Sequence, residues 1–157
     1  MQAQEIDTEN SRVEFEITKL GMLNVEGVIK GMQGTVDFDP AVPENAKFNV
    51  CIKAATVKTG IDKRDEHLRT EDFFYVDKYP EICVNSLSVS RTESGYVTKA
   101  ELTILDVTRE VEIPFIYENN TLKGSFTLNR FDYGLGEDTG TVMAGSEVDI
   151  TIISKLK

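Results

Sequence analysis

Cysteine and histidine are scarce in this chain. Among 157 residues there are two cysteines, Cys51 and Cys83, and one histidine, His67. They form neither a CxxC pair nor a cysteine–histidine cluster, which a structural zinc site would need. We therefore predict no metal and no cofactor. Both cysteines lie on predicted strands, in the phase opposite to their apolar neighbours. They could face each other as a disulfide, or remain two independent thiols.

Basic residues are also in short supply. The chain has 17 Lys and Arg against 27 Asp and Glu, a formal net charge of −10. No basic cluster offsets this excess, and such a surface repels phosphate backbones and anionic lipid headgroups. Nucleic-acid binding is not expected.

Long apolar runs are missing as well. No stretch approaches the roughly 18 apolar residues of a membrane-spanning helix, so we expect no transmembrane segment. No charged and apolar leader precedes Gln2, so no signal peptide is visible. The small residues at 2–4 could also be the remnant of a chain from which a leader was trimmed.

Alternation of apolar and polar residues dominates the rest of the chain. The first such segment places Val13, Phe15 and Ile17 on one face, and turn signals such as Asp39-Pro40 and Asn119-Asn120 separate the later ones. Residues 20–27 are predicted as an irregular or briefly helical link. We predict an all-β chain of about eight antiparallel strands, as a sandwich or barrel. Its length fits a single domain over residues 1–157.

A barrel could be hollow or filled. Phenylalanines recur in the inward phase, and small inward residues leave space. The phenylalanines are Phe15, Phe38, Phe48, Phe115 and Phe126, and the small residues are Gly31 or Gly34, Ala100 and Gly124. An eight-stranded barrel is about wide enough for one slender ligand. The same rings could instead meet and fill the centre, and the pattern alone leaves both alternatives open.

Residues 59–80 form a charged insertion among the strands. It contains Phe73, Phe74, Tyr75, Tyr79 and His67 among many acids and bases. A solvated loop has little use for four aromatic residues, and a core helix would not carry so many charges. We expect a short amphipathic cover over the mouth of the β structure. Within it we predict a helical segment near residues 62–72, capped by Asp62, with Arg64, His67 and Leu68 on one face.

Four stretches of the sequence resemble the YceI-like family of lipocalin-like, polyisoprenoid-binding proteins. They are Ile6-Asp7 with Ser11 to Phe15; Val25-Glu26-Gly27 with Gly34 to Asp39; Thr59-Gly60 with Arg64 to Leu68, Asp72 to Phe74 and Lys78 to Pro80; and Leu102 to Ile104 with Val107-Thr108, Val111 and Arg130 to Gly136. Ile6 stands where the family often has tryptophan, and Asp106 where it usually has glycine.

The resemblance implies an extended antiparallel lipocalin-like barrel around a long apolar tunnel that holds a polyprenyl or quinone tail. It implies no catalytic activity. Family members are often exported, so we expect a periplasmic or secreted protein, with the cytoplasm as the alternative. The expected partners are an isoprenoid or similar lipid and a second copy of the chain in a homodimer. The candidate ligand-binding residues are Phe15, Val36, Phe38, Phe48, Val50, Phe73, Phe74, Leu102, Ile113, Phe115, Phe126, Leu128 and Arg130.

Two polar groups allow other interpretations. Arg64, Asp65 and His67 could serve a lipid-modifying enzyme, because a histidine beside a carboxylate can transfer protons. We favour a structural role, with Asp65 bonded within the insertion. Arg130 falls in the inward phase and needs a partner if it is buried, either a carboxylate such as Asp132 or a ligand head group. A third hypothesis is an interaction or stress-response module that uses the barrel as a scaffold.

Overall fold

The alternating segments of the sequence form antiparallel strands. The computed structural model describes residues 4–17, 24–137 and 145–157. The strands in these ranges are β1 (Arg12–Ile17), β2 (Val25–Ile29), β3 (Gln33–Asp37), β4 (Lys47–Lys53), β5 (Glu81–Arg91), β6 (Tyr96–Ile104), β7 (Val107–Glu118), β8 (Thr121–Asn129) and β9 (Glu147–Lys155). The helices are α1 (Asp62–Leu68) and the 3₁₀ turns η1 (Thr8–Asn10), η2 (Pro43–Asn45), η3 (Ala54–Thr56) and η4 (Arg130–Tyr133).

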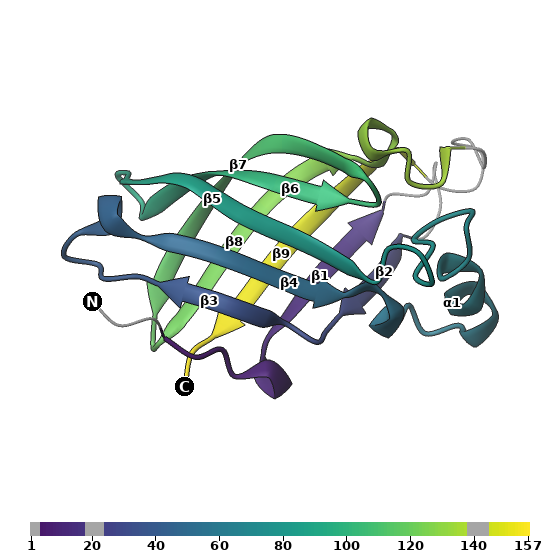
Figure 1. Cartoon of the computed structure of the whole chain (residues 1–157), viewed down its shortest axis with the longest axis horizontal. Coiled ribbons are helices and arrows are strands. Elements are labelled where there is room, and N and C mark those ends of the chain that lie inside the picture. The colour runs from purple at the N-terminus through teal and green to yellow at the C-terminus, as the bar shows by residue number, and fades with distance from the viewer. Residues whose placement is uncertain (1–3, 18–23, 138–144) are drawn as a thin grey trace.

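All of these strands belong to one sheet. Their order is β2-β1-β9-β8-β7-β6-β5-β4-β3, and each neighbouring pair is antiparallel. The sheet curls around an interior, with α1 at one end (Figure 1). The all-β, lipocalin-like fold class is confirmed, with nine described strands in place of about eight. That residues 1–157 make up a single domain stays a prediction.

The seam between the edge strands β2 and β3 is closed by short contacts in place of a ladder. At the outer edge of β2, Val28 and Lys58 exchange two backbone hydrogen bonds of 2.9 and 3.0 Å. At the edge of β3, Gln4 donates its backbone N–H to the Val36 carbonyl at 2.6 Å, and its side-chain oxygen accepts the Phe38 N–H at 3.2 Å. Non-sheet residues therefore complete the barrel wall.

The additional strand is β2. Residues 25–27 of the predicted link are extended and pair with β1, whereas residues 18–23 lie outside the described part of the chain. Gly27 faces Phe15 in the register, and a Cβ atom there would lie 2.3 Å from the end of the Phe15 ring. The glycine thus lets the Phe15 ring lie flat against β2, which a larger residue would prevent.

The insertion is helical only at its start. Helix α1 begins at Asp62, with Ile61 as its N-cap and no side-chain cap, so the predicted capping role of Asp62 is wrong. The helix ends at Leu68, where Thr70 donates its hydroxyl to the His67 carbonyl and Phe74 donates its N–H to the Leu68 carbonyl. The remaining residues up to Pro80 form turns. No helix in the described ranges is both long enough and apolar enough to cross a membrane.

Candidate functional site

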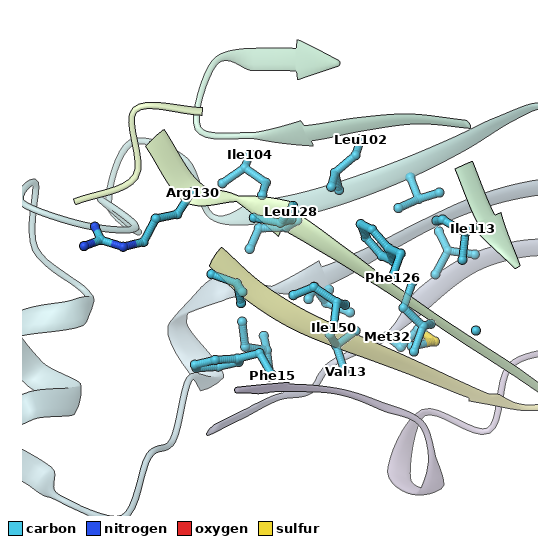
Figure 2. A pocket seen from close by; sticks show the side chains of 18 of the residues that line it. Val13, Phe15, Met32, Leu102, Ile104, Ile113, Phe126, Leu128, Arg130 and Ile150 are labelled. Atoms are coloured by element: carbon cyan, nitrogen blue, oxygen red, sulfur yellow. The ribbon is translucent and has the colours of Figure 1, made fainter. Parts of the chain in front are cut away.

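A cavity of about 390 Å³ lies inside the curled sheet. Every described strand contributes to its wall, together with α1, η4 and the turns after α1. The polar side chains on this wall are Arg64, His67, Thr98, Arg130 and Ser154, and the others are apolar. Figure 2 shows Arg130 at one end of the cavity and Met32 and Ile113 at the other. The cavity suits an elongated, mostly apolar guest.

The middle of the barrel is hollow. Val50, Val84, Phe126, Ile150 and Ile152 point inward and line the cavity, yet each keeps an intermediate exposure where a packed core would bury it fully. All five line the cavity, so the surface they leave exposed borders the cavity. The structure therefore decides between the two alternatives in favour of the hollow barrel.

Nearly all of the candidate ligand-binding residues lie on the cavity wall. These are Phe15, Val36, Phe48, Val50, Phe73, Phe74, Leu102, Ile113, Phe115, Phe126, Leu128 and Arg130. Phe38 does not line the cavity; it is 2% exposed and its ring packs against other aromatic residues. That any of these residues contacts a ligand stays a prediction.

Several wall residues were not among the candidates. The apolar ones on strands share the inward phase that identified the others, so the same signal could have found them; they are Val13, Ile17, Val25, Ile29, Ile52, Ile82, Val84, Ile104, Leu122, Val148, Ile150 and Ile152. Thr98 and Ser154 gave no such signal, because inward hydroxyls do not stand out in an apolar pattern. Of the small inward residues, Gly124 lines the cavity, whereas Gly31, Gly34 and Ala100 do not.

Helix α1 covers one end of the cavity with one face. Arg64, His67 and Leu68 all line the cavity, as their helical spacing predicts. Asp65, only 3% exposed, accepts hydrogen bonds from the Thr59 N–H and hydroxyl. Arg64 donates to the Thr59 hydroxyl and carbonyl, each at 2.8 Å. Arg64 and Asp65 therefore hold the start of the insertion onto its own helix.

His67 faces the carboxylate of Asp72 and not that of Asp65, which the enzymatic hypothesis would pair with it. Its Nε2 lies 2.8 Å from Asp72 Oδ2, and about half of each side chain is exposed. The ring also meets the Phe73 ring edge-on at 5.1 Å. Arg64 and Asp65 share Thr59 as a partner, whereas His67 pairs with Asp72, so the three side chains do not form one hydrogen-bonded group. These contacts fit a structural role.

Arg130, directly after β8, holds the following turns in place through hydrogen bonds to their backbone. The side chain is 2% exposed, and its guanidinium donates to the carbonyls of Gly145 at 2.8 Å and of Leu135 and Gly136 at 2.9 Å each. Burial lowers the pKa of Arg130 from its ordinary value, although an arginine stays protonated at neutral pH. The expected bond to the Asp132 carboxylate is not among those of the described residues; backbone carbonyls accept instead.

Gly136 joins this arginine to the insertion. Its backbone φ is +67°, and a Cβ atom there would lie 2.5 Å from both Arg130 Nη1 and Phe73 Cε1. Only glycine allows so close an approach in this conformation. Phe73 is thereby packed beside η4, which anchors the cover of the cavity to the barrel.

Cys51 and Cys83 form a disulfide on the outer face of the sheet. They are directly opposite each other on β4 and β5, which settles the alternative left open by the sequence. Glu81 lies beside them, and these three residues are the one group in the described ranges whose ligand atoms are close enough to hold a metal. Because the two sulfurs are bonded to each other, neither is a free thiolate that could bind a metal. The absence of a metal and of a cofactor stays a prediction.

A family model described as YceI-like domain matches residues 4–155. The chain belongs to the YceI-like family. A UPF0312 protein of Pseudomonas syringae pv. tomato is 33% identical over 150 residues, covering 88% of this chain and 78% of the relative. A UPF0312 protein of Photorhabdus laumondii is 36% identical over 107 residues, covering 68% and 56%.

Solved structures share the fold of this YceI-like chain. BcnA of Burkholderia cenocepacia has a TM-score of 0.86 at 23% identity, covering 96% of this chain and 98% of that one. A polyisoprenoid binding domain from Saccharophagus degradans has a TM-score of 0.73 at 15% identity, covering 98% and 97%. The family predicted from the sequence is thus confirmed.

Proposed function

We propose that this YceI-like protein binds a long apolar lipid with an isoprenoid tail inside its barrel and carries or sequesters it. The observation that carries the proposal is the hollow, apolar cavity of about 390 Å³. The polyisoprenoid binding domain of Saccharophagus degradans has the same fold, which supports this class of ligand.

The physical basis is burial. An isoprenoid tail has no hydrogen-bonding groups, so shape and the removal of apolar surface from water must supply its affinity. Each methylene buried contributes roughly 0.8 kcal/mol, and ordering the tail opposes this. The inward apolar side chains keep exposed surface toward the cavity, so binding removes accessible area from both partners.

Mass spectrometry of the native protein tests the proposal. We expect purified protein to release a lipid on organic extraction and to take up added prenyl alcohols. Ile150→Trp should fill the cavity and abolish both, because Ile150 lines it between the Arg130 end and the Met32 end (Figure 2). Ile153→Trp is the matched control: Ile153 lies on the same strand in the outward phase and does not line the cavity. Empty protein that takes up no probe, or equal loss in both variants, contradicts the proposal.

We also propose an exported location. Disulfides persist in oxidising compartments such as the periplasm and are rare in the cytosol. The bond between Cys51 and Cys83 supports this proposal. Fractionation of cells that express the complete gene would test it, and recovery in the cytosol would contradict it. The homodimer stays a prediction.

His67→Ala should leave lipid loading unchanged. The His67 side chain is half exposed, and its partner Asp72 is half exposed too, so the pair contributes at most about 1 kcal/mol to stability. The affinity comes from the apolar wall. The measurement is the ratio of bound lipid to protein in the variant and in the unmodified chain. A lipid-converting activity that disappears in the variant would instead favour the enzymatic hypothesis.

A further inference from the structure

Five aromatic rings gather around the start of β4 and the end of β7. We name them the aromatic floor: Phe38, Phe48, Tyr96, Phe115 and Tyr117. The Phe38 ring centroid lies 5.1 to 6.1 Å from those of the other four. Phe115 also lies 5.6 Å from Phe48 and is stacked on Tyr96 at 5.3 Å. Each ring is therefore held by at least one other.

The aromatic floor lies at the end of the barrel away from α1. Phe48 is the second residue of β4, and the chain leaves this strand at Lys53 to enter the insertion that carries α1. Figure 1 shows β4 running toward α1. Lys53 lies five positions after Phe48 along β4, a distance of roughly 17 Å.

The cavity reaches only the first layer of these rings. Phe48 and Phe115 line it, whereas Phe38, Tyr96 and Tyr117 do not. Phe38, behind them, is 2% exposed. A guest that enters beside α1 would therefore meet Phe48 and Phe115 near the inner end of its path, where Met32 and Ile113 also lie (Figure 2).

We propose that Phe48 and Phe115 determine the longest tail that the barrel accepts. This inference rests on the proposed function. A tail shorter than the cavity leaves apolar wall uncovered, and each added methylene raises affinity about fourfold. Once the tip touches the floor, further carbons stay outside the barrel and add no burial.

The packing of the rings in the aromatic floor keeps this limit on tail length fixed. Edge-to-face and stacked rings have preferred separations, and a ring that yields must displace its neighbours. Phe115 contacts three other rings of the floor, so it cannot swing aside alone. The floor therefore acts as a fixed stop at the end of the cavity away from α1.

Competition among geraniol, farnesol, geranylgeraniol and solanesol, read by native mass spectrometry, tests the proposal. Phe115→Leu opens space at the floor and should raise the relative affinity for tails one isoprene unit beyond the original optimum by roughly tenfold. Ile152→Phe fills the cavity opposite Gly124, its cross-strand partner, and should shift the optimum to shorter tails. Ile116→Ala removes an exposed side chain from the outer face beside Phe115 and should shift nothing.

The outcomes separate this inference from the function on which it rests. If the unmodified protein binds none of the four alcohols, the proposed function fails. If it binds them but Ile152→Phe and a folded Phe115→Leu keep the original order of preference, lipid binding stands and the floor does not set the length. A preference for longer tails in Phe115→Leu and for shorter tails in Ile152→Phe supports the inference. Ile152→Phe still decides the question if Phe115→Leu does not fold.

Discussion

Replacing Arg130 with methionine should lower the free energy of unfolding by about 3 kcal/mol, because a buried acceptor that loses its partner costs about 1–3 kcal/mol. The guanidinium serves three backbone carbonyls, and those of Leu135 and Gly136 accept from the same nitrogen in a buried setting. Methionine fills much of the volume but donates no hydrogen bond. Chemical denaturation with urea measures the change, and the melting temperature should fall with it.

Arg109→Met provides the matched control. Arg109 lies nearby and donates to the Asp132 carbonyl at 2.8 Å, but its side chain is exposed. Its replacement should therefore change stability by less than about 1 kcal/mol, as is usual for surface substitutions. Equal effects of the two substitutions would show that the buried carbonyls do not depend on Arg130.

Removal of the disulfide should cost a comparable amount. The bond links residues 32 positions apart, and closing a loop of that length stabilises a protein by roughly 3–4 kcal/mol through the unfolded chain. Because the two half-buried cysteines lie on the outer face, their replacement leaves the cavity wall intact. The double variant Cys51→Ala/Cys83→Ala should unfold at lower urea concentration and still load lipid.

A reductant gives an independent check on this prediction. It should destabilise the unmodified protein to the level of the double variant and leave the double variant unaffected. If thiol labelling proves full reduction while the unfolding midpoint stays in place, the disulfide contributes nothing to stability.

The strands were predictable because their chemistry is local. Alternation of Val13, Phe15 and Ile17 with charged residues specifies a half-buried strand without reference to any partner. The number of strands was harder, since β2 contains Gly27 and its place depends on the Phe15 ring across the sheet. The disulfide needed the register of β4 and β5, which alternation alone does not give and the insertion between them obscures.

The site also has a part that the local sequence pattern predicts and a part that depends on distant residues. Strand phase identified most of the cavity wall, because inward residues on a curled sheet face a common centre. Phe38 has the same inward phase but lies behind Phe48 and does not line the cavity. A period-two pattern shows which face a residue is on, but not how far along the barrel it lies. Arg130 donates to the carbonyls of Leu135 and Gly136, and because every residue carries a carbonyl, no side-chain motif could predict these two bonds. Whether the centre is hollow depends on the curvature of the whole sheet.

Gln4 affects more than the closure of the seam. An unpaired strand edge is a template on which another chain can add a strand and begin aggregation. Gln4 occupies part of the β3 edge with both its backbone and its side chain. By covering this edge, Gln4 also protects the sheet from the addition of a strand of another chain, which is the first step of fibril-like growth.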